Sequence, residues 1–402
     1  MSFNRKSDKT KRSAVKKIVL KKSFIITLLI LALLLYLGYR LYSYVRYAYY
    51  YRSNHEDYSK EYKTNTNALY SKAYFTKTLN KYGVRDASEI DQIYQNSYVI
   101  PGLETTRSMI DGEHFSTCTS MTPQGVCVAG PYLLISAYCG AGKHNSVIYV
   151  LNKSTHKFIK EIVLRGRPHV GGVTYDPRHQ NIWFCDYSGK KQTAYVSSFS
   201  MSDLKKYDIK KNKKAIHYEY SVPIYSLQRT SFLDYSDGKL YVGHYENSLS
   251  SLTTIQTFTI DDETGGLVSS SVYQWDTSER EDVILPSKVM TIQSRIQGFT
   301  KNDYMSALST SYGILRSRLM VYDANNKAAK KNASRSSGAS ESKEPDDSLR
   351  YLDEPDSTYS LPPMLEQISD YNGKLYLCFE SAAYAYRARL NRKVDRIIVF
   401  DF

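Results

Sequence analysis

Short runs of apolar and β-branched residues recur along most of the chain as a two-part phrase. A strand-like tetrad comes first, and a second strand-like run follows it, usually ending near an acid. The tetrads begin at Leu133, Ile182, Leu240, Tyr304 and Leu375. The second runs cover 147–151, 193–199, 254–261, 318–323 and 396–401. Strand repeats about 40–50 residues long are typical of a β-propeller, whose blades cannot bury their faces singly. The pattern therefore predicts an all-β propeller of about five blades over 97–402.

The first repeat indicates four strands in each blade. They are predicted, from the innermost to the outermost, at 123–129, 132–138, 147–151 and 158–164. After the third strand of the last repeat the sequence offers no fourth, and an unpaired sheet edge is a liability. We therefore expect 98–103, just upstream of the first blade, to pair with 396–400 and close the ring.

The N-terminal region has the composition of a signal anchor. Residues 1–22 hold nine Lys or Arg against one acid. Residues 24–39 carry no charge, and as a helix they would extend roughly 24 Å, slightly short of a bilayer core. A cleaved signal peptide is the alternative, but no small-x-small site follows promptly. We predict a cytoplasmic tail at 1–22, a single transmembrane helix at 23–46 and an extracellular remainder at the cell membrane.

Two further segments differ in composition from the repeats. Residues 47–96 are polar and tyrosine-rich, with helix-compatible stretches at 67–82 and 87–96, and are interpreted as a short helical neck. A solvated spacer is the expected outcome, with a tyrosine partner surface as the alternative. Residues 324–359 have almost no bulky aliphatic side chain, so we expect a disordered insertion.

Charge and cysteine content exclude several classes of protein. Much of the formal net charge of +14 lies in the basic tail, so the composition does not indicate a nucleic-acid partner. Among five cysteines, Cys185 and Cys378 occupy equivalent tetrad positions and are expected to pack as small apolar residues. A bridge from Cys118 to Cys127 or Cys139 is left open. No CxxC or paired histidine suggests a zinc site, so neither metal nor cofactor is expected.

Polar side chains recur where the innermost strand of each blade begins. Because these strands surround the axis of a propeller, their starts meet at one end of it. The candidate ligand-binding residues are Gln124, His169, Arg229, Arg295, Gln297 and Glu366. They could instead bond only to one another and to trapped water. Catalysis of glycoside cleavage needs a second carboxylate, for which Asp234 is the candidate, and His244 is a minor candidate for the same face.

Four segments carry a resemblance to a known family. They are Met-Thr-Pro-Gln-Gly-Val-Cys at 121–127, Leu-Ile-Ser-Ala-Tyr at 134–138, Ser-Val-Ile-Tyr-Val-Leu at 146–151 and His-Val-Gly-Gly at 169–172. Together they resemble a family of exported, membrane-anchored propeller-like proteins of Gram-positive bacteria. The resemblance covers roughly 97–402 and is weakest in the fourth blade and the insertion. That family has no settled activity, so the resemblance implies fold and location only.

These observations favour a binding or scaffolding module at the cell envelope, with a glycan, peptide or protein ligand. The alternative is a hydrolase of an envelope polysaccharide using channel carboxylates, and whether the chain is an enzyme stays open. Two axial carboxylates about 5–10 Å apart would favour the enzyme. An axis lined only by amides, arginine and histidine would favour binding.

Overall fold

The structure is a computed structural model that describes residues 23–45, 63–84, 86–110, 112, 114–188, 193–273, 280–324 and 347–401. The predicted basic tail at 1–22, the start of the neck and most of the insertion lie outside these ranges. The chain divides into two compact units, Met1–His55 and Glu56–Phe402. In the first, one helix, Ser23–Val45, is long and apolar enough to cross a membrane, and none of its most apolar stretch is buried in protein.

The second unit contains five four-stranded antiparallel sheets, the blades. The first two, from inner to outer strand, are β4 (Met121–Ala129), β5 (Tyr132–Cys139), β6 (Val147–Asn152) and β7 (Phe158–Val163), then β8 (Val173–Asp176), β9 (Asn181–Ser188), β10 (Thr193–Ser200) and β11 (Tyr220–Pro223). The third is β12 (Phe232–Ser236), β13 (Lys239–Gly243), β14 (Leu252–Thr259) and β17 (Lys288–Gln293). The last two are β18 (Ile296–Lys301), β19 (Met305–Thr310), β20 (Ser317–Asp323) and β21 (Ser357–Leu361), then β22 (Leu365–Tyr371), β23 (Lys374–Phe379), β24 (Arg396–Asp401) and β1 (Tyr98–Val99).

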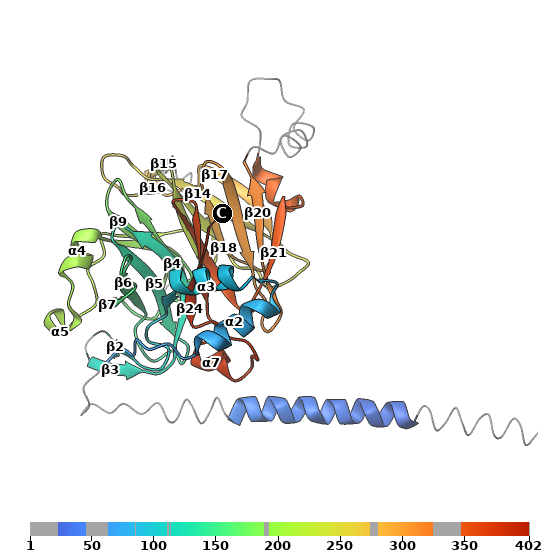
Figure 1. Cartoon of the computed structure of the whole chain (residues 1–402). Helices are drawn as coiled ribbons and strands as arrows, with labels where there is room; N and C mark the ends of the chain where they lie inside the picture. The colour runs from blue at the N-terminus through green and yellow to red at the C-terminus, as the bar shows by residue number, and fades with distance from the viewer. Residues whose placement is uncertain are drawn as a thin grey trace, which may run out of the picture. The chain divides into compact units, whose positions relative to one another are not determined.

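The five blades are arranged as a closed ring. Each inner strand contacts the inner strands of the two neighbouring blades, in the order β4, β8, β12, β18, β22 and back to β4. Inner strands are buried on both sides; every residue of β4, for example, is buried. The predicted five-bladed propeller of four-stranded sheets is therefore confirmed, and the second and third strands lie where the tetrads and following runs placed them (Figure 1).

The ring closes as predicted, through a shorter strand than expected. Tyr98 pairs with Ile397 and Val99 with Arg396 in antiparallel register. The backbone N–H of Ile100 adds a 3.0 Å bond to the carbonyl oxygen of Asp395. The strand ends there because Gly102 turns away with φ +75°, and its backbone nitrogen donates to the Asn65 carbonyl oxygen at 2.7 Å instead of to β24.

The described part of the neck packs on the fifth blade instead of forming a solvated spacer. It contains α2 (Lys72–Lys81) and α3 (Ala87–Asn96); α3 contacts β24, and α2 contacts α3 (Figure 1). Their inward side chains share one apolar cluster with fifth-blade residues: Phe75, Leu79, Ile90 and Ile93 against Leu375, Leu377 and Ile398. The short apolar stripe of each helix therefore packs against the fifth blade.

Further short elements lie outside the twenty blade strands. Two are hairpins, β2 (Thr106–Ile110) with β3 (His114–Cys118), and β15 (Ser270–Tyr273) with β16 (Arg280–Val283). Three are short helices: α4 (Met201–Lys206), α5 (Ile209–Asn212) and α7 (Tyr384–Arg387).

The expected disordered insertion at 324–359 is ordered over its C-terminal part. A 3-10 helix spans Asp347–Leu352, and β21 begins inside the same segment. Tyr351 is only 4% exposed, because its ring packs edge-on against Phe299 at 5.7 Å and Tyr322 at 5.2 Å. One aromatic side chain anchors a stretch whose average composition is that of a loop.

Candidate functional site

Backbones approach closely where the inner strands begin. A Cβ on Gly171 would lie 2.0 Å from the carbonyl oxygen of Ser231, and one on Gly298 would lie 2.7 Å from the backbone nitrogen of Ile368. Only glycine fits such contacts between neighbouring blades. The Gly-Gly and Gln-Gly pairs of the sequence therefore serve the tight packing of the ring.

Register irregularities at the same level bring polar side chains to the axis. The pairing of the inner strand with its neighbour shifts between Pro123 and Val126, between Ile296 and Gly298, and between Leu365 and Ile368. Such bulges re-aim side chains. Gln124, Gln297 and Glu366 each lie within one of these irregular stretches.

Gln367 closes the axis at this level and is fully buried. Its Oε1 accepts from the backbone nitrogens of Val126 (3.1 Å) and Val173 (2.8 Å). Its Nε2 donates to the carbonyl oxygens of Val173 (2.9 Å) and Leu233 (2.8 Å). All four hydrogen-bonding positions of the amide are thus used, and a residue of the fifth blade ties together the first three.

The neighbouring Glu366 forms a carboxyl pair with Glu380, the residue directly after β23. Their side chains hydrogen-bond to each other, and burial with mutual repulsion raises the pKa of Glu366 well above its usual value. Burial also raises the pKa of Glu380. Gln124 Nε2 donates to Glu380 Oε2 at 2.9 Å, and Gln297 Nε2 lies 3.5 Å from Glu366 Oε1. Two adjacent buried carboxyls cannot both ionise easily, so the pair retains a proton at neutral pH.

His169 and Arg229 lie together beside this pair. The His169 ring packs on the Tyr138 ring at a centroid distance of 4.0 Å. Desolvation of the ring, with the nearby Arg229 charge, lowers the pKa of His169, although the residue keeps contact with solvent. With this lowered pKa, the His169 imidazole is neutral at physiological pH. Tyr138 also hydrogen-bonds to Tyr386.

Arg295 lies directly before the inner strand of the fourth blade, β18. Its guanidinium lies 3.6 Å from the Tyr312 ring centroid, and its Nε donates to the carbonyl oxygen of Asn247 at 3.1 Å. Burial raises the pKa of Tyr245, and the charge of Glu366 adds to that shift while Arg295 opposes it. Arg295 thus belongs to the same electrostatic neighbourhood as the carboxyl pair.

Three of the six candidate residues therefore lie in bulges, and the other three, His169, Arg229 and Arg295, lie just before the inner strands β8, β12 and β18. Further residues that the sequence argument missed contact them. We call the set the axial cluster: Gln124, Tyr138, His169, Arg229, Arg295, Gln297, Glu366, Glu380 and Tyr386. The positions of Glu380 and Tyr386, after the second strand of the fifth blade, could have identified them from the sequence. In an antiparallel blade the end of the second strand lies beside the start of the first, so residues after each second strand reach the same face.

Asp234 is not the second axial carboxylate. It is buried further along β12, where its Oδ2 accepts from Thr300 Oγ1 (3.0 Å) and the Lys301 backbone nitrogen (3.1 Å). It joins the third blade to the fourth. His244 follows β13, and burial beside Arg229 lowers its pKa.

The axial cluster matches neither arrangement that separated the two sequence hypotheses. Carboxyl groups are present, but in direct hydrogen-bond contact instead of the roughly 5–10 Å of glycoside hydrolases. What the site offers is an imidazole, two amides, two guanidinium groups, a carboxyl pair that shares a proton, and aromatic faces. Such groups can exchange hydrogen bonds with, and stack against, an uncharged polar ligand.

Known proteins add little to this picture. No family model and no curated protein matches the chain. Among solved structures it is similar to the β-propeller domain of the Trilobed protease from Pyrococcus furiosus, at 10% identity and TM-score 0.31 over 65% of this chain and 78% of that one. A nidogen/laminin complex gives 10% identity and TM-score 0.31 (68% and 84%), and a protein of unknown function from Bacteroides thetaiotaomicron gives 9% and 0.34 (73% and 73%).

At such TM-scores these likenesses carry no argument, and the class of protein follows from the strand pairing of the chain itself. The chain is a five-bladed β-propeller of four-stranded sheets, with an N-terminal helix apolar enough to span a membrane.

Proposed function

We propose that this protein is a membrane-anchored binding module whose propeller recognises an uncharged, polyhydroxylated ligand, an envelope glycan, at the axial cluster. The observation that carries the proposal is the linked group of Gln124, Glu380, Glu366 and Gln297. Hydroxyl groups both donate and accept hydrogen bonds, as do amides and a carboxyl pair that shares a proton. A peptide or protein ligand is the alternative occupant.

Aromatic and cationic groups around the pair support the same ligand class. Tyr138 offers a ring that lies against His169 at a tilt of 31°, and Tyr312 offers an exposed ring beside Arg295. Sugar rings present C–H faces that pack on aromatic side chains, while their rims hydrogen-bond to polar groups. The guanidinium groups of Arg229 and Arg295 in the axial cluster disfavour a strongly cationic ligand.

The location is supported by the sequence. Helix Ser23–Val45 has the length and hydropathy of a membrane span, and the nine basic residues preceding it favour a cytoplasmic N-terminus. The propeller would then be extracellular, at the envelope of a Gram-positive bacterium if the family resemblance holds. Protease treatment of intact cells should digest the propeller, and digestion only after lysis would refute this orientation.

Binding is tested with the full-length protein in detergent against neutral wall-glycan fragments, anionic wall polymers and wall peptides. We expect titration calorimetry to show binding of the neutral fragments. Gln124→Leu and Glu380→Leu should weaken it about 10-fold each, the value of one lost hydrogen bond. Asp234→Asn, a buried polar change outside the axial cluster, is the matched control.

Two results would overturn the proposal. One is binding of peptides alone. The other is glycan affinity unchanged in both Leu variants while the control variant behaves identically. Release of new reducing ends from the glycan would instead restore the hydrolase hypothesis, which the direct contact between Glu366 and Glu380 does not favour.

A further inference from the structure

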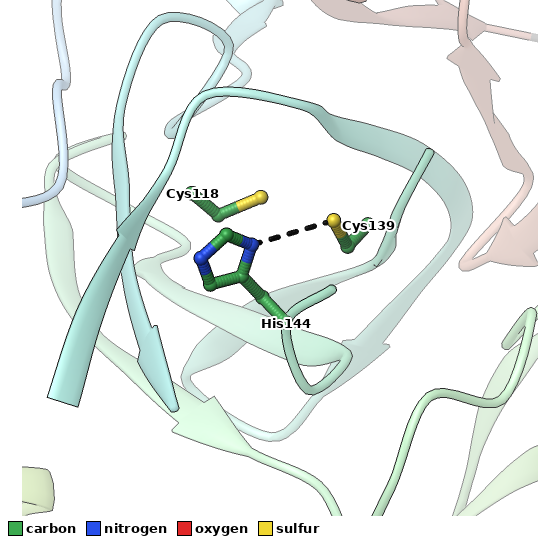
Figure 2. A group of neighbouring side chains, drawn as sticks. All are labelled: Cys118, Cys139 and His144. Carbon is green, nitrogen blue, oxygen red and sulfur yellow. Dashed lines mark hydrogen bonds between the residues drawn. The ribbon is translucent and has the colours of Figure 1, made fainter. Parts of the chain in front are cut away.

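Three side chains of metal-ligating type, from two separate stretches of the sequence, meet beside the first blade. They are Cys118 at the end of β3, Cys139 at the end of β5, and His144 in the turn before β6. One ligand atom from each lies within 4.8 Å of the other two. Figure 2 shows both sulfur atoms and one imidazole nitrogen pointing toward a common centre. All three residues are buried, at 0%, 4% and 1% exposure.

A tight turn produces this arrangement. The backbone nitrogen of Gly142 donates to the Cys139 carbonyl oxygen at 2.8 Å, and Gly142 has φ +66°. The next residues are fixed to the β2–β3 hairpin, since Asn145 donates from its backbone to Met109 (2.8 Å) and accepts from Ser108 Oγ (2.7 Å). The cluster thus joins the hairpin to the first blade.

The His144 ring is oriented by a second hydrogen bond. Its Nε2 lies 3.0 Å from Ser116 Oγ, and its Nδ1 lies 3.5 Å from Cys139 Sγ. Metal-bound histidines typically engage their remaining nitrogen in this way, which fixes the tautomer. The backbone nitrogen of Ser120 donates to Cys118 Sγ at 3.4 Å. Both the imidazole and one sulfur are therefore held by neighbours outside the cluster.

The separation between Cys139 and His144 fits a small tetrahedral ion. Bonds of about 2.3 Å to sulfur and about 2.0 Å to nitrogen imply a sulfur-to-nitrogen edge of about 3.5 Å. Cys139 Sγ and His144 Nδ1 already have that separation. A disulfide between Cys118 and Cys139 would leave Nδ1 of a buried imidazole facing only sulfur.

We propose that Cys118, Cys139 and His144 bind one Zn²⁺ ion through two thiolates and a neutral imidazole. Binding releases two thiol protons to solvent and forms two zinc–sulfur bonds and one zinc–nitrogen bond. Two thiolates neutralise Zn²⁺, so the buried site has no net charge, whereas Cu⁺ in the same ligands would leave one negative charge in an apolar cluster. The sequence does not predict this site, because His144 lies in a turn and Cys118 lies on a separate hairpin, so the three ligands follow no known zinc-binding spacing.

The test uses the full-length protein in detergent, reduced and stripped with chelator, then given Zn²⁺, Co²⁺ or Cu⁺. We expect one Zn²⁺ per chain by elemental analysis, a sulfur-to-cobalt charge-transfer band with Co²⁺, and a higher melting temperature with Zn²⁺. Cys118→Ser and His144→Gln should each weaken zinc binding by about 10-fold or more. Cys127→Ser, a buried free thiol of the same blade outside the cluster, is the matched control.

Melting of the stripped variants separates binding from folding, because a variant that melts like the stripped wild type yet fails to bind has lost only the ligand. The proposal is overturned if wild type takes up no stoichiometric Zn²⁺, or if His144→Gln binds as well as Cys127→Ser. It is also overturned if peptides from freshly isolated membranes carry a Cys118–Cys139 disulfide. Preferential retention of Cu⁺ would reject the charge argument and the identity of the ion.

Discussion

Replacing Gln367 with methionine removes the amide at the axis while keeping an unbranched side chain of similar length. Four buried backbone groups, on Val126, Val173 and Leu233, then lose their partners. A buried donor or acceptor left unsatisfied costs about 1–3 kcal/mol. With Gln367 fully buried, water cannot replace the amide, so the loss should reach at least about 4 kcal/mol, at the extreme of single substitutions.

The measurement is urea unfolding of the full-length protein in detergent, followed by far-ultraviolet circular dichroism. Gln297→Met is the matched control, because Gln297 is half-buried and makes one long contact of 3.5 Å; it should lose less than about 1 kcal/mol. A Gln367→Met protein within about 1 kcal/mol of wild type, with an unchanged denaturant slope, would show that the amide does not hold the inner strands together.

Three further outcomes are expected. Because the folded carboxyl pair keeps a proton that the unfolded chain loses, the free energy of unfolding should fall above about pH 4.5 by up to about 1.4 kcal/mol per pH unit, and Glu380→Gln should flatten this fall in melts from pH 5 to 9. A profile identical to wild type would contradict the raised pKa values. Ile100→Pro should lose about 1–3 kcal/mol more than Ile100→Ala, since proline cannot donate to Asp395 across the closing strand; equal loss would mean that this bond is dispensable. Gly171→Ala should lower the melting temperature by several degrees, because the new methyl would lie 2.0 Å from the Ser231 carbonyl oxygen, and an unchanged temperature would refute the close approach of blades.

The blades could be predicted because their second and third strands are strongly apolar and recur in the same order in each repeat. Leu133, Leu240 and Leu375 each begin a buried strand core, and such runs admit few other folds when they recur. Closure by the segment around Tyr98 followed from the cost of an open edge. In contrast, the sequence favoured Glu366 and not the neighbouring Gln367, since a bulge and not the residue type decides which side chain closes the axis.

Elements outside the repeats were harder to predict because composition averages over a window, whereas burial is decided by single residues. The neck and the insertion are both polar on average. Phe75 and Tyr351 nevertheless anchor them on the propeller. Cys118 and His144 were hidden for a related reason, because they meet only after a hairpin and a turn fold back on the first blade.

The carboxyl pair is the strongest argument that the axial cluster does more than complete the fold. One residue along β22, Gln367 already ties three inner strands together with a neutral amide, each of its four bonds satisfied. Closing the ring therefore does not require Glu366 or Glu380. Both carry raised pKa values, which means that keeping them together reduces stability at neutral pH. A pair that the fold does not need, and that destabilises it, agrees with the proposed ligand, whose hydroxyl groups would add hydrogen bonds to those that Gln124 and Gln297 already donate.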